Sequence, residues 1–258
     1  MTHPHPSEWL QDAPLIIAHR GASRYAPENT LAAFRLAGEM GAQAIELDAK
    51  LTRDGQVVVH HDRTLERTTT GAGKLSAHTL DQLKQLDAGR KFSASFTGEG
   101  IPTLEEVFEA VSSSVLINVE LTNYERPMDA LPEEVVRLVK AAGLQARVLF
   151  SSLNPLSLRR AKRLAPEIPR ALVVRASAAG LKRAVYRWVS PQQAYHPEDP
   201  MVTPETILRE HRAGRRVNVW TVNDPARIRE LLDWGVDGVI TDVPDLALRA
   251  RDGRSGTG

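Results

Sequence analysis

The sequence predicts a (β/α)₈ TIM barrel from three observations: eight short apolar runs, amphipathic stretches between them, and capping residues or glycines at the junctions. The runs are mostly apolar throughout, as expected for parallel strands that are buried on both faces. Eight strand–helix units in 258 residues favour a closed α/β barrel over an open doubly wound sheet. The predicted strands are 15–19, 44–48, 115–121, 147–152, 170–175, 192–196, 217–222 and 238–242.

Capping residues set the boundaries of the predicted helices. Thr103 followed by Glu106 forms a capping box, which satisfies two backbone N–H groups at the start of a helix. Three other helices begin with an N-cap residue and a proline whose fixed φ suits the first helical position: Asn154-Pro155, Thr203-Pro204 and Asp224-Pro225. Four glycines stand where helices should end: Gly41, Gly143, Gly214 and Gly235.

The regular alternation of strands and helices breaks between residues 62 and 102. This segment is polar and rich in Gly, Ser and Thr, with one brief helical pattern at 79–86. A separate domain of this size would bury too little surface to be stable. We therefore interpret 62–102 as an insertion in the second βα loop of a single barrel domain, 14–250. Residues 1–13 and 251–258 are expected to be disordered tails.

Composition excludes several classes of protein. The chain has 33 basic and 32 acidic residues and a net charge of +1, so it lacks the basic surface that binds nucleic acid or an anionic membrane. The absence of cysteine excludes disulfides, thiolate metal sites and a cysteine nucleophile. There is no signal-peptide pattern, and no apolar run approaches the roughly 20 residues of a membrane helix. We expect a soluble cytoplasmic protein without stable membrane association.

Acidic residues interrupt two of the apolar strands. Glu46 and Asp48 are two residues apart, so they share one face of a strand and repel each other unless a cation or a catalytic task holds them there. Glu120 lies near the end of another strand, and the carboxyl ends of barrel strands meet at one mouth. Three carboxylates suit Mg²⁺ or Ca²⁺. An arginine partner would explain Glu46 and Asp48 without a metal, and a lone glutamate is usually solvated or salt-bridged.

Histidines also stand near strand ends. His19 ends the first strand, where it could act in catalysis or be a hydrogen-bonded imidazole of the core. His60 and His61 are adjacent, so at most one of them points at a shared site. His196 ends the sixth strand and is a weaker candidate.

Short motifs in a fixed order resemble the glycerophosphodiester phosphodiesterase family. Their joint order and spacing, from residue 15 to about residue 244, are more specific than any single motif. The motifs are HRG (19–21), ENT (28–30), ELD (46–48), HHDRTLERTT (60–69), INVEL (117–121) and WTVND (220–224). The resemblance implies a (β/α)₈ barrel with a small insertion after the second strand, a divalent cation (Mg²⁺ or Ca²⁺), and hydrolysis of small-molecule glycerophosphodiesters to glycerol 3-phosphate and an alcohol.

The resemblance also implies roles for individual residues. His61 is preferred to His60 because the family's histidine directly precedes an aspartate, here Asp62. One imidazole would deprotonate the nucleophile, either water or the substrate's own glycerol hydroxyl, and the other would protonate the departing alkoxide. Carried over by position, the acid/base pair is His19 and His61, the metal ligands are Glu46, Asp48 and Glu120, and the phosphate-binding residue is Arg20.

One position departs from the family pattern. Many members carry a lysine two residues after the third metal carboxylate, where it helps to bind phosphate, and this chain has Thr122 there. Lys50 and Arg175 stand at strand positions from which either could replace that cation. Trp220 follows an apolar strand near the mouth and could wall the substrate pocket or pack in the core.

The ENT motif carries weaker expectations. Glu28 could orient His19 or Arg20. Asn29 and Thr30 are expected to cap the following helix, because short polar side chains accept hydrogen bonds from its first backbone N–H groups.

The leading functional hypothesis is a metal-dependent phosphodiesterase acting on small water-soluble diesters. A lysophospholipase D-like activity on lipid substrates would favour exposed apolar loops at the mouth, and an aromatic content of 5% does not indicate them. A non-catalytic phosphodiester-binding barrel is supported only by Thr122, since a binding protein needs no acid/base pair. A nuclease is disfavoured because the nearly neutral chain offers no surface that would follow a nucleic-acid backbone.

Overall fold

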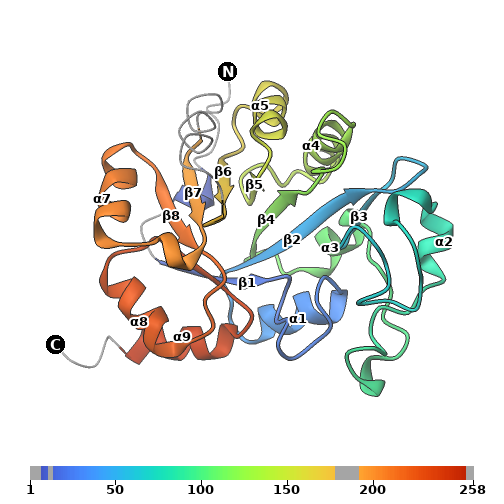
Figure 1. Ribbon diagram of the computed structural model, residues 1–258, viewed down its shortest axis with the longest axis horizontal. Helices are drawn as coiled ribbons and strands as arrows, with labels where there is room; N and C mark the ends of the chain where they lie inside the picture. Colours follow the sequence, from blue (N-terminus) through green and yellow to red (C-terminus); the bar gives the residue numbers. More distant parts are fainter. Residues whose placement is uncertain (1–6, 11–13, 178–191, 254–258) are drawn as a thin grey trace.

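The predicted barrel is present in the computed structural model, which describes residues 7–10, 14–177 and 192–253. β1 (Leu15–His19) pairs in parallel with both β2 (Ala44–Leu51) and β9 (Gly238–Thr241), and this double pairing closes a ring of eight parallel strands (Figure 1). Each strand of the ring overlaps one predicted segment. The other strands are β4 (Leu116–Leu121), β5 (Val148–Ser152), β6 (Arg170–Val174), β7 (Ala194–Pro197) and β8 (Arg216–Val219).

A short hairpin lengthens the second strand beyond its predicted end. β3 (Val57–Val59) runs antiparallel to β2, with Leu51 opposite Val57. Gly55, at φ +81°, makes the turn between the two strands, a conformation that glycine adopts without steric cost. As a result β2 continues two residues past Ala49, the last of its residues that pairs with β4.

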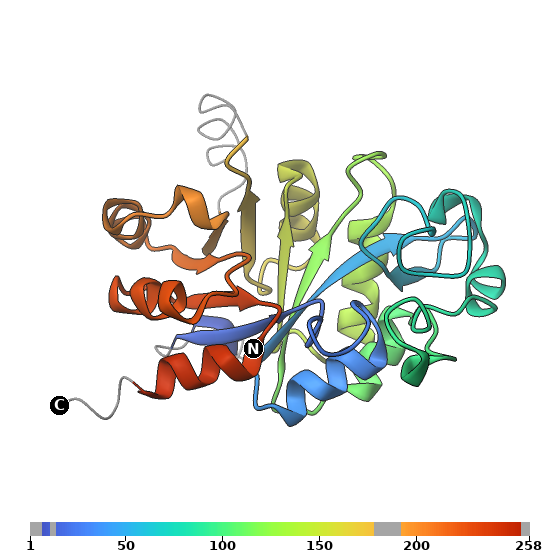
Figure 2. The ribbon, with the colours of Figure 1, turned by 60° about the horizontal axis from the view of Figure 1, so that its bottom comes forward.

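Helices surround the ring on its outside (Figures 1 and 2). They are α1 (Leu31–Glu39), α3 (Leu104–Ala110), α4 (Leu131–Ala141), α5 (Pro155–Leu164), α7 (Pro204–Arg212), α8 (Pro225–Asp233) and α9 (Pro244–Asp252). The predicted N-caps of α5, α7 and α8 accept hydrogen bonds from backbone N–H groups of the first turn, and α3 begins with the predicted capping box. The four predicted helix-ending glycines all have positive φ, between +69° and +89°.

Apolar side chains fill the space between the strands and the helices. One cluster joins β1, β2, β4 and β5 to α1, α3 and α4, and a second joins β8 and β9 to α7, α8 and α9. These layers bury the outer face of the sheet, which leaves the inward-facing side chains to shape the barrel's interior. Within the described residues, none of the helices has the length and apolar character that a membrane span requires.

The N-terminal end of the barrel is closed by a segment that the sequence does not mark as structured. η1 (Glu8–Leu10) is a single 3₁₀ turn in which Trp9 is 1% exposed. The indole packs against side chains from the starts of the barrel strands, among them Ala44 and Leu116, and Trp9 Nε1 donates to the Arg147 carbonyl at 2.7 Å. The expectation of disorder is therefore wrong for residues 7–10, because one aromatic side chain anchors them.

The segment 62–102 lies beside the β2–β3 hairpin, at the edge of the barrel (Figure 1). It contains α2 (Leu80–Lys84) and two 3₁₀ turns, η2 (Leu75–Ala77) and η3 (Ala94–Phe96). Five of its apolar residues pack on Val58 of β3: Leu65, Leu75, Leu83, Ala88 and Ile101. At the other end of the chain, α9 continues to Asp252, two residues beyond the predicted limit of the barrel.

Replacing Trp9 with alanine is expected to lower the free energy of unfolding by about 3–5 kcal/mol, the usual range for truncating a buried tryptophan. Leu10 is the matched control, since it is 42% exposed and Leu10→Ala should cost no more than about 0.5 kcal/mol. Urea denaturation followed by far-UV circular dichroism measures both values. Equal, small losses would show that the barrel does not depend on this segment.

Candidate active site

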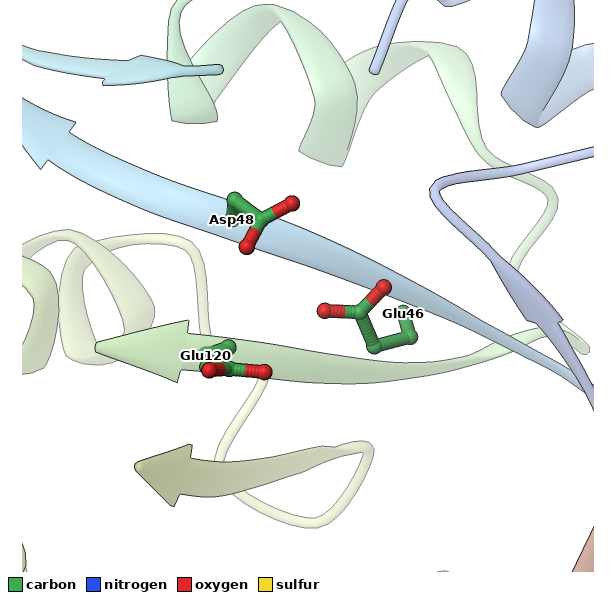
Figure 3. A group of neighbouring side chains, drawn as sticks. All are labelled: Glu46, Asp48 and Glu120. Atoms are coloured by element: carbon green, nitrogen blue, oxygen red, sulfur yellow. The ribbon is translucent and has the colours of Figure 1, made fainter. Parts of the chain in front are cut away.

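Three carboxylates meet inside the mouth of the barrel. Glu46 and Asp48 lie two residues apart on β2 and so face the same way, and Asp48 is paired in register with Glu120 on β4. Figure 3 shows the three side chains on these neighbouring strands, and one carboxylate oxygen from each lies within 4.8 Å of the others. The structure thus brings the three predicted residues together. Both Glu46 and Asp48 are 3% exposed.

Burial and mutual repulsion make it costly for all three carboxylates to be ionised at once. The pKa of Glu46 is raised well above its usual value by burial and by the charges of Asp48 and Glu120. Burial and the Asp48 charge raise the pKa of Glu120 to about 7. Burial also acts against ionisation of Asp48, but Arg20 and His61 outweigh it and lower the Asp48 pKa. A dication would relieve this repulsion, and three hard oxygen donors are the ligands that Mg²⁺ and Ca²⁺ prefer.

An arginine partner accounts for only part of the cluster's charge. Arg20 Nε lies 3.3 Å from Asp48 Oδ2, and the Arg20 backbone N–H donates to Glu46 Oε2 at 3.1 Å. Arg20 Nη1 also donates to Glu28 Oε1 at 2.8 Å, so Glu28 orients Arg20. Among the described residues, no arginine is ion-paired with Glu120, so this one guanidinium does not neutralise the cluster. The donor set therefore fits a divalent cation better than it fits an arginine alone.

The loop after β1 is folded so that it reaches β2. Gly21, at φ +84°, lies so close to α1 that a Cβ there would sit 2.6 Å from the Ala33 backbone. Asn29, also left-handed at φ +57°, donates from Nδ2 to Asp48 Oδ2 at 2.9 Å and accepts the Asp48 backbone N–H at 3.3 Å. The expectation that Asn29 caps the helix is wrong, because its side chain holds Asp48 instead. Thr30 is the N-cap of α1.

Each of the two predicted catalytic histidines is hydrogen-bonded to an aspartate. His19 Nδ1 lies 2.7 Å from Asp242 Oδ1. A carboxylate only accepts hydrogen bonds, so Nδ1 carries the shared proton and Nε2 is left to face the cavity. Burial alone would raise the pKa of Asp242, but hydrogen bonds from His19, Asn223 and Ser23 lower it to about 2.

His61 repeats this arrangement with a different aspartate. His61 Nδ1 lies 2.7 Å from Asp62 Oδ1. Arg67, from the inserted segment, donates to both Asp62 and Glu28. Although burial opposes it, the Arg67 and His61 hydrogen bonds hold the pKa of Asp62 far below its usual value.

The other two histidines near strand ends are buried. His60 is 4% exposed, its Nε2 lies 3.1 Å from the Thr64 carbonyl, and burial lowers its pKa. His196 lines the bottom of the cavity, where Asn218 Nδ2 lies 2.9 Å from its Nε2 and burial lowers its pKa to about 3. Only His61 of the adjacent pair faces the cavity, and His196 stays neutral near physiological pH.

Two joined hollows make up the cavity at the mouth, and they share Asp48, His61, Glu120 and Arg175. The inner hollow lies among the barrel strands. All seven residues predicted for the site line it: His19, Arg20, Glu46, Asp48, His61, Glu120 and Trp220.

The outer hollow has a volume of about 500 Å³, which is within the range of small-molecule sites. It lies between the loop after β4 and the inserted segment, and its lining includes Lys50, Thr122 and Tyr124. The shared carboxylates and His61 therefore stand between a confined chamber and a roomier one. The inner hollow is the narrow one, with a volume of about 30 Å³.

Trp220 lies between the core and the inner hollow. It packs against the apolar layer inside the barrel and also lines the inner hollow. Trp220 Nε1 donates to the His196 carbonyl at 2.9 Å, which fixes the indole. Arg175 lies over the ring, with its guanidinium carbon 5.9 Å from the ring centre.

Three residues of the site were not assigned to it from the sequence. Asp242 directly follows a barrel strand, so its position could have predicted it in the same way as the three carboxylates. Asn29 and Tyr124 lie in loops, and the Tyr124 hydroxyl donates to Glu120 and accepts the Leu153 N–H at 3.2 Å. No periodic pattern marks loop residues of this kind, so only their contacts reveal them.

The sequence of this chain is similar to those of known phosphodiesterases. Residues 19–246 match the glycerophosphoryl diester phosphodiesterase family. A glycerophosphodiester phosphodiesterase of Caldanaerobacter subterraneus subsp. tengcongensis is 39% identical over 234 residues, which are 90% of this chain and 95% of that protein. A Bacillus subtilis glycerophosphodiester phosphodiesterase is 31% identical, over 94% of this chain and 88% of the relative.

Solved structures agree with the sequence relatives. An Oleispira antarctica phosphodiesterase, solved in complex with the product sn-glycerol-3-phosphate, has a TM-score of 0.85 and 35% identity, over 93% of this chain and 97% of that one. A glycerophosphodiester phosphodiesterase of Agrobacterium tumefaciens has a TM-score of 0.73 and 31% identity, over 91% of this chain and 98% of that one.

Added Mg²⁺ or Ca²⁺ is expected to raise the midpoint of thermal unfolding, because the cation binds the folded carboxylate cluster and not the unfolded chain. At a concentration of 100 Kd the stabilisation is about 2.7 kcal/mol. Asp48→Asn should remove most of the shift, whereas Glu105→Gln, on the exposed surface of α3, should keep it. Scanning calorimetry of the three proteins tests this. The same shift in Asp48→Asn and the wild type would place the cation elsewhere.

Proposed function

The chain belongs to the glycerophosphoryl diester phosphodiesterase family, and from this premise we propose that it hydrolyses small glycerophosphodiesters to glycerol 3-phosphate and an alcohol in a cation-dependent reaction. The chain is a phosphoric diester hydrolase. One observation carries the proposal: a single hollow combines three clustered carboxylates with two imidazoles, each hydrogen-bonded to its own aspartate. A protein that only bound phosphodiesters would need neither imidazole.

Glu46, Asp48 and Glu120 are the residues that would hold the divalent cation. When bound, the cation supplies Lewis-acid stabilisation of the negative charge that develops on the phosphate oxygens. Asn29 and Tyr124 hydrogen-bond to Asp48 and Glu120, so they keep two of the carboxylates in position. These contacts come from loops on different sides of the cluster, which restricts how the carboxylates can rotate.

His19 and His61 are the proposed acid/base pair. One neutral imidazole takes a proton from the nucleophile as the new P–O bond forms, and the other, protonated, gives a proton to the alkoxide as the old P–O bond breaks. Asp242 and Asp62 hold the two Nδ1 atoms, so both reacting nitrogens are Nε2. If the substrate's glycerol hydroxyl attacks, the first product is a cyclic phosphate that water then opens; if water attacks, glycerol 3-phosphate forms directly.

Arg20 is the proposed phosphate-binding residue of the inner hollow. Its Nη1 is bound to Glu28 and its Nε lies beside Asp48, so Nη2 is left to donate to a non-bridging oxygen. Because the guanidinium is held by two carboxylates, little side-chain entropy is lost when it binds phosphate. Trp220 would then form an apolar wall for the carbon atoms of the substrate.

A lysophospholipase D-like activity is the second candidate, and one observation favours it. Met128 and Leu156, in the loop after β4 and at the start of α5, are 70% and 42% exposed. The two segments are in contact, since Asn154 Nδ2 donates to the Pro127 carbonyl at 3.3 Å. An exposed apolar rim of this kind could contact the acyl chain of a lysolipid.

The purified protein is expected to release glycerol 3-phosphate from glycerophosphocholine or glycerophosphoethanolamine only when Mg²⁺ or Ca²⁺ is present, because the carboxylates alone repel an anionic substrate. A coupled glycerol 3-phosphate assay with and without chelator measures this. Faster turnover of lysophosphatidylcholine would favour the lipid-directed activity instead. No release with any cation would contradict both candidates.

His61→Ala is expected to lower kcat by about 10²- to 10⁴-fold, the usual contribution of a general acid or base. His60→Ala is the matched control on the neighbouring residue, and its smaller effect should be on stability because His60 is buried and bonded to a backbone carbonyl. Steady-state kinetics and thermal unfolding of both variants separate the two effects. Equal losses of kcat would overturn the choice of His61.

A further inference from the structure

A lysine reaches across the mouth from β2 to β4. Lys50 lies two residues beyond Asp48 and faces the same way, and the β2–β4 register, whose last pair is Ala49 with Leu121, brings position 50 beside position 122. Lys50 Nζ donates to Thr122 Oγ1 at 2.9 Å and approaches the Thr122 carbonyl at 3.5 Å. The ammonium group therefore lies over β4, one strand away from its own backbone.

The Thr122 hydroxyl oxygen is free to accept a hydrogen bond from this ammonium. Its hydroxyl proton is used in a hydrogen bond to the Ala49 carbonyl at 2.7 Å, which leaves the oxygen lone pairs for Lys50. Thr122 itself is 6% exposed, so the oxygen cannot turn toward bulk water. Position 122, directly after β4, has an uncharged side chain, and a charge from β2 lies on it.

Lys50 is a half-buried cation of the cavity that has no carboxylate in contact. Among the residues that the structure describes, its hydrogen bonds go only to Thr122, and no carboxylate oxygen lies within 4.0 Å of its Nζ. Of the other cations that line the cavity, Arg20 and Arg63 are ion-paired. Arg126 and Arg175 are exposed, so water solvates their charges. A partly buried cation without a counter-ion is costly unless an anion is bound beside it.

The surroundings of Lys50 indicate which anion it would bind. It lines the outer hollow together with Asp48, His61 and Glu120, which belong to both hollows. Arg20 enters from the inner hollow, so a phosphate placed between His61 and the carboxylate cluster would have one cation on either side. This places Lys50 next to the group on which the proposed reaction takes place.

On the basis of the phosphodiesterase function proposed above, we propose that Lys50 is a phosphate-binding residue. Its ammonium donates to a non-bridging phosphate oxygen from the outer hollow, and the hydrogen bond to Thr122 holds it in place. The cation that this chain lacks at position 122 is in this way supplied by the neighbouring strand. Lys50 acts on the ground state and the transition state of the phosphoryl group through charge and takes no part in proton transfer.

The test measures binding of glycerol 3-phosphate and of inorganic phosphate by calorimetry with saturating Mg²⁺. Lys50→Met should weaken both by about 10- to 100-fold, as expected for loss of a hydrogen bond to a charged group. Lys50→Gln, which can still hydrogen-bond to Thr122, should show a similar loss because it lacks the charge. Lys162→Met, on the exposed surface of α5, is the matched control and should bind as the wild type does.

Moving the charge back to β4 makes the test specific. Thr122→Lys combined with Lys50→Met should recover most of the lost phosphate affinity and of kcat/KM, because the ammonium returns to the same place from the other strand. The affinity of the ligand-free protein for Mg²⁺ should not fall in Lys50→Met, since removing a positive charge beside the carboxylates cannot disfavour a dication. A merely structural lysine would lower both affinities.

Four results would overturn the proposal. Unchanged binding of glycerol 3-phosphate by Lys50→Met and Lys50→Gln would mean that Lys50 only offsets the charge of the carboxylates. Parallel losses of Mg²⁺ and phosphate affinity would mean that it supports the fold. If the wild type hydrolyses diesters and the Lys50 variants do so equally well, only this inference fails; if the wild type neither binds nor hydrolyses them, the proposed function fails as well.

Discussion

The repulsion among three carboxylates confined to two neighbouring strands is the constraint on which the rest of the site depends. Glu46, Asp48 and Glu120 cannot move apart, because the parallel register of β2 and β4 fixes their backbones and the barrel wall encloses their side chains. Every polar group that touches the cluster relieves or directs this charge. Arg20 offsets part of it, and Asn29 holds one carboxylate in a fixed orientation. What remains is an excess of negative charge that a dication fits.

The barrel separates stability from chemistry along its axis. At the amino ends of the strands, the interior is a layer of small and apolar side chains that Trp9 covers from below. At the carboxyl ends, the same inward-facing positions carry carboxylates, imidazoles and Lys50. Because side chains alternate along each strand, the change from apolar to charged occurs within two residues, as between Ala44 and Glu46. Changes at the two ends should therefore affect different properties of the protein.

The inserted segment is joined to the site through a chain of ion pairs. Arg67 bonds Asp62, which holds His61, and also Glu28, which holds Arg20. The proposed base or acid and the proposed phosphate-binding arginine are thus linked by one exposed guanidinium. This link gives the segment 62–102 a part in shaping the site, in addition to its own small apolar cluster on β3.

Local patterns in the sequence determined the strands, the helix caps and the inward orientation of three side chains, those of Glu46, Asp48 and Glu120. These features depend on neighbours within a few residues. Composition and periodicity could not reveal that Trp9 closes the barrel, that Asn29 holds Asp48 instead of capping a helix, or that Tyr124 bonds Glu120. Strand position identified Lys50 as a candidate cation, but only the pairing of β2 with β4 decided that its ammonium lies on Thr122. The physical reason is that periodicity acts along one element, whereas hydrogen bonds between loops and strands distant in the chain exist only once the barrel is closed.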